Sequence, residues 1–221
     1  MKKKNSKKHW RNIFPAIPIP LHKDYSINEK ELREYVRWLA SIDGIDGIVC
    51  NGHTGEITSL NREEKKRVTE IIVEEVGDKV LVISGIAGDE GTLDAIDRAK
   101  EMEEVGADGI LLMPPHVWLR FGMERESPVN YFKDVGKAID IGIIIHQYPY
   151  DCKAFYPVEM VIEMAKIPNV KALKCGIRHM SVYERDVGIL RKKAPRLSIL
   201  SCMDEYLIST LYIGVDGALV G

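Results

Sequence analysis

Apolar and polar positions along this chain fall into alternating blocks that predict strands and helices in turn. Short apolar runs typical of buried strands lie near residues 15–20, 46–51, 80–85, 109–113, 141–146, 169–174, 197–202 and 217–220. The segments between them carry apolar residues at helical spacing, as Leu32, Val36 and Leu39 do in the first. Eight mostly apolar strands that alternate with helices predict an α/β fold, and they favour a (β/α)8 TIM barrel over an open doubly wound sheet.

A repeated tetrapeptide supports this architecture. Gly-apolar-Asp-Gly occurs at residues 44–47, 106–109 and 214–217, each time between an amphipathic segment and an apolar run. Its first glycine suits the end of a helix, and the residues after it suit a buried strand. The spacings between copies fit two and four strand–helix units of about 30 residues. Two helix starts carry the pattern of a capping box, Asn28 with Glu31 and Asn61 with Glu64.

The chain ends at Gly221, where the eighth strand would turn into its loop and helix. We therefore count seven helices and expect the final helix and a C-terminal extension to be missing from a truncated chain. The outer faces of strands eight and one would then lack cover and expose apolar surface. We interpret residues 14–221 as a barrel domain that is incomplete at its C-terminus, and the basic residues 1–13 as a solvated tail.

Composition excludes some classes of partner. The chain has 31 basic and 33 acidic residues, and this balance is unlike the broad positive field of a nucleic-acid-binding protein. No apolar run approaches the ~20 residues of a membrane-spanning helix. The four cysteines have no CxxC spacing, which predicts reduced thiols and a cytoplasmic protein. We expect neither nucleic acid nor membrane as a partner.

The loop after the second strand has the composition of an anion-binding loop. It reads Asn51-Gly-His-Thr-Gly-Glu56, in which Gly52 and Gly55 allow the backbone to approach a ligand. Successive N–H groups around His53, with the hydroxyl of Thr54, would suit a small carboxylate or phosphate. The alternative is an ordinary turn in which the glycines serve only the backbone geometry.

A lysine closes the sixth strand. Alternation places Val170, Ala172 and Lys174 on one face, and an apolar barrel lumen on that face would favour the neutral amine of Lys174. A neutral lysine at the mouth of a barrel is a Schiff-base nucleophile. The alternative is a lysine that reaches solvent, a role that Lys171, of opposite parity, fits better.

These motifs together resemble the dihydrodipicolinate synthase and N-acetylneuraminate lyase family. The match rests on the NGHTGE loop, the SGIAG and LLMPP strand ends at residues 84–88 and 111–115, and Lys174, in this order from Phe14 onward. The resemblance implies a (β/α)8-barrel class I aldolase or dehydratase whose lysine forms an imine with pyruvate or another 2-oxo acid. It also implies that His53 and Thr54 bind the carboxylate, that no cofactor is needed, and that the protein forms dimers or tetramers.

The chain also departs from the family pattern. His146 takes the position of the family's strand-five tyrosine, and His116 that of its partner tyrosine after strand four, so both are candidate proton-transfer residues. Tyr148, of the same parity as His146, is a lesser candidate that would supply a phenol. After Pro149 the chain lacks the arginine with which dihydrodipicolinate synthases bind their second substrate, which argues against that activity.

We therefore predict a lyase that cleaves carbon–carbon or carbon–oxygen bonds of a 2-oxo acid through a Schiff base. One alternative is a non-catalytic barrel that binds a 2-oxo acid or sugar acid, or an inactive fragment. Another is a metal-dependent enzyme in which the three histidines, with Cys175 and Cys202, bind zinc. A third is that each histidine only forms a local hydrogen bond. The second substrate and the direction of the reaction stay open.

Overall fold

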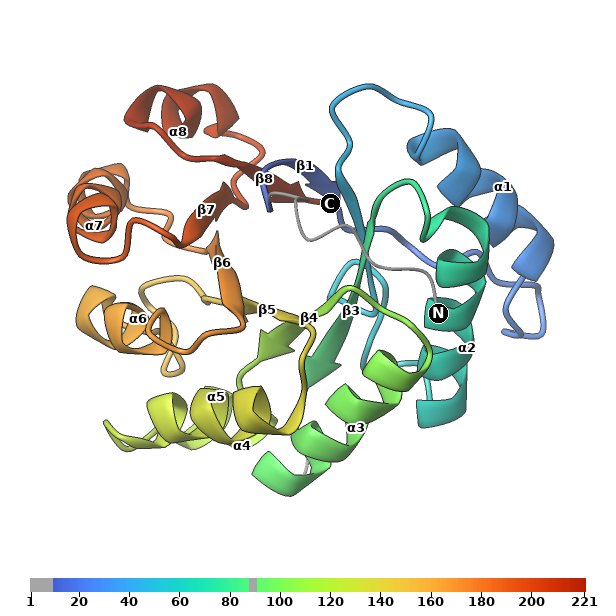
Figure 1. Ribbon diagram of the computed structural model, residues 1–221, viewed down its shortest axis with the longest axis horizontal. Helices are drawn as coiled ribbons and strands as arrows, with labels where there is room; N and C mark the ends of the chain where they lie inside the picture. The colour runs from blue at the N-terminus through green and yellow to red at the C-terminus, as the bar shows by residue number, and fades with distance from the viewer. Residues whose placement is uncertain (1–9, 88–90) are drawn as a thin grey trace.

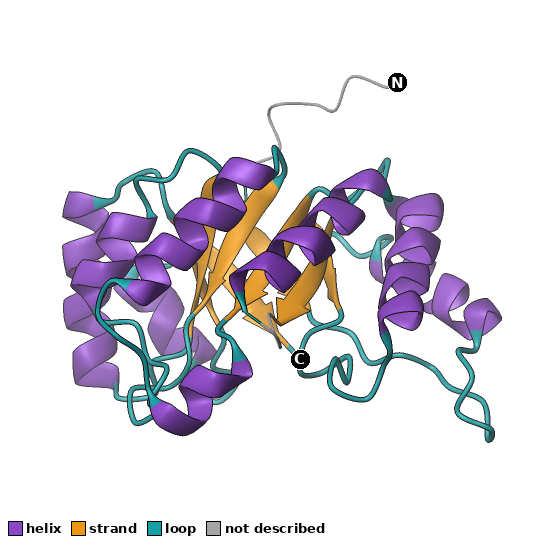
Figure 2. Cartoon of the chain, turned by 90° about the horizontal axis from the view of Figure 1, so that it is seen from below, coloured by secondary structure: helices purple, strands orange, loops and turns teal. Residues whose placement is uncertain are grey.

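Eight parallel strands surrounded by helices make up this protein (Figure 2). The computed structural model describes residues 10–87 and 91–221. The strands are β1 (Asn12–Pro15), β2 (Gly47–Cys50), β3 (Leu81–Ala87), β4 (Gly109–Met113), β5 (Gly142–His146), β6 (Val170–Cys175), β7 (Ser198–Ser201) and β8 (Gly217–Val220). The helices are α1 (Glu29–Leu39), α2 (Arg62–Val76), α3 (Thr92–Glu104), α4 (His116–Phe121), α5 (Ser127–Ala138), α6 (Val158–Met164), α7 (Met180–Lys193) and α8 (Leu207–Ile213). The expected (β/α)8 architecture is confirmed.

The described residues contain one helix more than the seven expected. The additional helix is α4, which has six residues and lies between β4 and α5. Pro115 precedes it, and Gly122, with a φ of 87°, separates it from α5. A helix this short does not give a separate periodic signal, so the sequence pattern did not resolve it.

The strands form a nearly closed ring in the order β1-β8-β7-β6-β5-β4-β3-β2. β1 and β8 pair along all four residues of each strand. β1 and β2 meet only at two isolated parallel bridges, Ile13 with Ile45 and Ala16 with Val49. The least regular pairing of the ring therefore lies between β1 and β2, whereas the β1–β8 pair is continuous.

β1 lies earlier than the expected strand at 15–20. It begins at Asn12, two residues before the expected domain boundary, because Asn12 and Ile13 pair with β8. The N–H groups of Ala16 and Ile17 still donate to Val220 and Val49, but Pro18 and Pro20 have no N–H with which to continue the pairing. Residues 1–9 of the expected basic tail lie outside the described residues.

The buried apolar side chains form one cluster inside the barrel and two outside it. The inner cluster takes residues from all eight strands: Phe14, Ala16, Val49, Leu81, Ile83, Leu111, Ile144, Ala172, Leu200 and Leu219. Trp10 packs against this cluster at the beginning of β4 and β5, where a Cβ on Gly109 or Gly142 would meet its ring. The outer clusters join the strands to the helices. The lumen is therefore a packed core, as in other TIM barrels.

The repeated tetrapeptide has one structure in all three copies. Its first glycine has a φ between 91° and 96° each time, in the left-handed region that favours glycine. Its aspartate ties neighbouring elements in two copies: Asp108 accepts the N–H of Val82 on β3 (3.0 Å), and Asp216 accepts that of Ile199 on β7 (2.8 Å). The last glycine begins β2, β4 or β8. The repeat thus marks the turns into β2, β4 and β8.

Exposed apolar residues occur on the two helices that flank β1 and β8 in Figure 1. Trp38 on α1 and Ile208, Leu211 and Tyr212 on α8 are all exposed. We expected such surface on the outer faces of the eighth and first strands, but Ala218 of β8 is buried and Ile13 of β1 is partly buried. No helix in residues 10–87 and 91–221 has the length and apolar character needed to cross a membrane.

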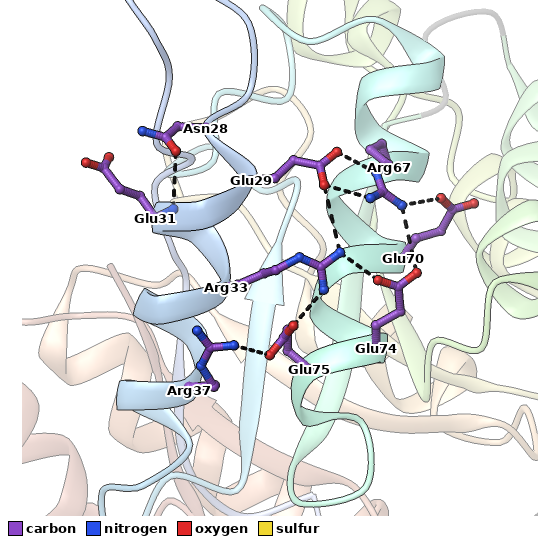
Figure 3. A network of polar contacts seen from close by, with 9 residues as sticks. All are labelled: Asn28, Glu29, Glu31, Arg33, Arg37, Arg67, Glu70, Glu74 and Glu75. Carbon is purple, nitrogen blue, oxygen red and sulfur yellow. Dashed lines mark hydrogen bonds and ion pairs between the residues drawn. The ribbon is translucent and has the colours of Figure 1, made fainter.

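Local signals start α1 and α2. Asn61 and Glu64 form both hydrogen bonds of a capping box at α2. At α1 only half of the expected box is present, because Asn28 accepts from the N–H of Glu31 but the return bond is absent. Figure 3 shows this cap beside a network of ion pairs that joins the two helices. The network contains Glu29, Arg33, Arg37, Arg67, Glu70, Glu74 and Glu75.

Arg67 is the natural place to test the stabilising effect of this network. It donates two hydrogen bonds of 2.7 Å to Glu29, which lower the pKa of that carboxyl. Because both side chains are partly exposed, we expect Arg67→Met to lower the free energy of unfolding by at most about 1 kcal/mol. The difference should shrink in high salt. Denaturant unfolding measures it, with Lys66→Met as a control that removes one positive charge from the same helix; equal effects of the two variants would contradict the prediction.

Candidate active site at the mouth of the barrel

Lys174 and His146 lie opposite each other at the carboxyl ends of neighbouring strands. They are paired residues in the register of β5 and β6. Ile144 and Ala172, two residues before each of them, belong to the cluster inside the barrel. Because side chains alternate along a strand, both candidates are on the lumen side, at the end where TIM barrels carry their active sites.

A register shift in β6 determines this orientation. Ile143 pairs with Val170 but Ile144 pairs with Ala172, so Lys171 is an extra residue in β6. Val170 consequently packs in the outer cluster, and our expectation that it shares a face with Lys174 is wrong. Lys171 is half-buried and its Nζ donates to the carbonyl of Pro168 at the start of the strand (2.9 Å), away from the mouth.

The environment of Lys174 favours its neutral amine. The side chain is half-buried, and burial lowers the pKa of its amine below the usual 10.5. The nearby Cys202 and Asp204 act in the opposite direction. The charge of Lys174 in turn lowers the pKa of His53 and of His146, so the amine lies near both rings.

His53, His146 and Tyr148 form a compact group around this amine. The Tyr148 hydroxyl and His53 Nε2 are 2.8 Å apart and share a hydrogen bond. The ring of Tyr148 stacks on that of His146, with centroids 4.9 Å apart and an angle of 21°. The rings of His53 and His146 lie 5.2 Å apart. The structure thus brings together four of the residues predicted from sequence.

His146 is buried and, in the described part of the chain, has one ring nitrogen without a hydrogen-bond partner. It is 5% exposed, and its Nδ1 has no hydrogen-bond partner among the described residues. Burial is the largest cause that lowers its pKa well below 6.5, followed by the charges of Lys174 and His53. Burial and these two charges therefore disfavour the imidazolium form of the ring.

The depressed pKa of His146 predicts a pH dependence of stability. In the unfolded chain the ring titrates near 6.5, so below this pH the unfolded state binds more protons than the folded state. The free energy of unfolding should therefore decrease as the pH falls through about 6.5. We expect His146→Gln, which removes this titration, to lose less stability than the wild type between about pH 7.5 and 5. Denaturant titrations at several pH values measure this, and identical slopes would contradict the expectation.

The loop after β2 presents several free backbone donors. Within the described residues, the N–H groups of Gly52, His53, Thr54 and Gly55 donate no hydrogen bond. A Cβ on Gly55 would lie 3.0 Å from the carbonyl of Ile17, so the backbone approaches closely there. A Cβ built on Gly221, just after β8, would lie 2.6 Å from Thr54 Oγ1, which places Thr54 beside the end of β8. Consecutive free N–H groups are a known means of binding anions.

The remaining candidates stand apart from this group. His116 is exposed at the start of α4, and within the described residues it forms no hydrogen bond, ion pair or ring contact with the other candidates. Cys175 is buried in the outer cluster. In the described part of the chain, no three or more His, Cys, Asp or Glu side chains are grouped so that they could hold a metal ion.

Sequence reasoning missed Asn51 as a residue of the site. Asn51 directly follows β2, has a φ of 52°, and is fully buried beneath the loop. The available signal was its place between a strand and a glycine, because asparagine tolerates a positive φ better than most residues do. Its tertiary contacts, described below, were not visible in the sequence.

The sequence is similar to those of known proteins. The sequence profile of the Dihydrodipicolinate synthetase family matches residues 9–220. An uncharacterized DapA-like lyase of Thermofilum pendens is 30% identical over 212 residues, which are 94% of this chain and 67% of the relative. An N-acetylneuraminate lyase of Clostridium perfringens is 28% identical, and the match covers 95% of this chain and 70% of the relative. This chain thus spans about two thirds of the length of these relatives.

Solved structures show the same fold. An N-acetylneuraminate lyase from Mycoplasma synoviae superposes with a TM-score of 0.80 at 26% identity, over 98% of this chain and 70% of that one. A dihydrodipicolinate synthase from Thermotoga maritima superposes with a TM-score of 0.86 at 22% identity, over 95% and 69%. The family profile spans nearly the whole chain and the fold agrees with it. The chain belongs to the dihydrodipicolinate synthetase family.

Proposed function

We propose that this protein is a Schiff-base lyase that acts on a pyruvate-like 2-oxo acid. The observation that carries the proposal is Lys174 itself, a half-buried amine with a lowered pKa beside two histidines at the mouth of the barrel. A lysine whose ammonium form is destabilised by burial supplies the neutral amine that attacks a carbonyl. No organic cofactor is required for this step.

The first stage is formation of the imine. The loop from Gly52 to Gly55 would hold the substrate carboxylate with its free N–H groups, assisted by the hydroxyl of Thr54. The amine of Lys174 then attacks the 2-oxo carbon, and the carbonyl oxygen leaves as water with one proton from the amine and one from solvent. The product is a protonated imine, which draws electrons from the neighbouring carbon.

The second stage breaks a bond of the substrate. In aldol cleavage, a base removes the proton of the 4-hydroxyl group, the C3–C4 bond breaks, and its electron pair forms an enamine with the imine carbon. In dehydration, a proton is lost from C3 and a hydroxyl group leaves as water. His146 is our candidate for moving these protons, because its ring lies beside those of His53 and Tyr148 and within reach of the charge of Lys174.

Two other residues have proposed roles of smaller weight. Tyr148 would contact the substrate through its phenol while it remains bonded to His53. His116 stays a candidate for proton transfer from sequence alone, because its exposed place on α4 does not bring it to the other residues. A cytoplasmic location and assembly into dimers or tetramers also remain expectations.

The second substrate is proposed to differ from that of dihydrodipicolinate synthases. Tyr150 and Asp151 follow Pro149, where those enzymes have an arginine. Here Tyr150 packs against Phe155, with ring centroids 5.0 Å apart, and Asp151 lies 3.3 Å from His179. Neither Tyr150 nor Asp151 can offer a guanidinium to a second carboxylate.

Borohydride trapping tests the proposed chemistry. The protein is incubated with pyruvate and borohydride, and the intact mass and the modified peptide are then determined. A pyruvyl adduct on Lys174 is expected. Pyruvate binding without an adduct, in protein shown to be folded by circular dichroism, would instead support the non-catalytic binding barrel.

A further inference from the structure

The side chain of Asn51 ties the loop at residues 52–55, which we propose binds the substrate carboxylate, to α2 and β3. Its Nδ2 lies 2.9 Å from the carbonyl of Lys65, 3.0 Å from Thr69 Oγ1 and 3.0 Å from Ser84 Oγ. Lys65 and Thr69 are on α2, and Ser84 is on β3. One fully buried side chain therefore fixes the first residue of the loop to both a helix and a strand.

The same residue carries two local costs. Its backbone is in the left-handed region, and its Oδ1 is buried with no hydrogen-bond partner among the described residues. An unsatisfied buried acceptor lowers the stability of the folded protein. Strained and unsatisfied groups of this kind persist where the surrounding structure holds them, and they concentrate at functional sites.

The backbone around Asn51 is held from two sides. A Cβ on Gly85 would lie 2.0 Å from the Asn51 carbonyl oxygen, so β3 contacts the start of the loop directly. A Cβ on Gly55 would lie 3.1 Å from the Asn51 nitrogen, so the loop turns back onto its own beginning. The Asn51 side chain completes this support from α2.

We propose that Asn51 is a positioning residue that presents the N–H groups of Gly52–Gly55 to the substrate carboxylate. The inference rests on the proposed function, because it assigns Asn51 to the recognition of the 2-oxo acid. Asn51 does not contact the reacting atoms in this scheme. Its loss should therefore weaken binding of a ketone that has a carboxylate and spare one that has none.

Asn51→Gly is the decisive variant, because glycine accepts the positive φ and removes only the anchor. Imine trapping with borohydride is measured over a range of concentrations of pyruvate and, separately, of acetone. We expect the half-saturating pyruvate concentration to rise at least about tenfold, the rate at saturation to stay within about twofold, and the trapping efficiency with acetone to be nearly unchanged. Equal losses with both ketones would show a general structural role and overturn the inference.

Two further variants control for strain and for folding. Tyr25→Gly relieves a positive φ of 68° at an exposed residue far along the chain from Asn51, and we expect no change in the preference for pyruvate. Thr69→Val removes one of the hydroxyls that Asn51 contacts and keeps the shape, so it should shift pyruvate in the same direction by a smaller factor. If Asn51→Gly does not fold, Thr69→Val becomes the test. An unchanged half-saturating pyruvate concentration in Thr69→Val would then overturn the inference.

The outcomes separate this inference from the proposed function. If wild-type protein forms the adduct on Lys174 but Asn51→Gly retains its preference for pyruvate, only the role of Asn51 is wrong. If wild-type protein forms no adduct, calorimetric titration with pyruvate compares the same variants without covalent chemistry. Weaker binding by Asn51→Gly would then support the anchor, and no binding by the wild type would overturn both proposals.

Discussion

Lys174→Ala should abolish the trapping of pyruvate by borohydride. The variant removes the half-buried amine that faces His53 and His146, and no other lysine shares its face of β6. Because a methyl group cannot form an imine, we expect no pyruvyl adduct at concentrations that saturate the wild type, and loss of lyase activity on any substrate found. Intact-mass spectrometry and peptide mapping measure the result.

Lys171→Ala is the matched control, since it removes a lysine three residues away on the same strand. Lys171 is the extra residue at the register shift, and its Nζ donates to the carbonyl of Pro168. This variant should keep both the adduct and its pyruvate dependence. An adduct that persists in Lys174→Ala, or that disappears in Lys171→Ala, would show that the nucleophile has been assigned to the wrong residue.

Gly85→Ala should strongly destabilise the protein. The added Cβ would lie 2.0 Å from the carbonyl oxygen of Asn51, and backbone cannot yield there without moving β2 or β3. Overpacking of this kind costs about 1–3 kcal/mol or more, and contact with backbone favours the upper end. We expect the midpoint of denaturant unfolding to fall accordingly.

Gly188→Ala provides the contrast for the same chemical change. Gly188 lies inside α7, is exposed, and has no atom within 4 Å of an added Cβ. Alanine should therefore stabilise the helix by up to about 1 kcal/mol. Equal stability of the Gly85→Ala protein and the wild type would mean that β2 and β3 are not in the contact described here.

Much of the fold was predictable because its signals are local. The three copies of the repeat, the capping box at Asn61 and the apolar runs each depend on residues close together in the chain. The position of β1 was predicted poorly because its pairing with β8 begins at Asn12, and because Pro18 and Pro20 have no N–H with which to continue it to residue 20. α4 was missed because six residues are too few for a periodic pattern.

The candidate site was predictable in its residues but not in its geometry. Lys174, His146 and the loop at residues 52–55 could be selected because parallel strands of a barrel bring their carboxyl ends together. The hydrogen bond between His53 and Tyr148 joins residues 95 positions apart, and no sequence signal specifies it. Simple alternation also misplaced Val170, because the extra residue in β6 depends on pairing with β5.

The sequence by itself determined the order of strands and helices, their turns, and the presence of a lysine and an anion-binding loop at strand ends. The order of the elements and their turns follow from short-range hydrogen bonding and from the periodicity of burial, whereas anion binding by the loop stays a prediction. Only the tertiary structure decided which charges meet and which groups lose water. Burial lowers the pKa values of His146 and Lys174, and contacts with α2 and β3 hold the side chain of Asn51. Both effects depend on packing between segments that are distant in the sequence.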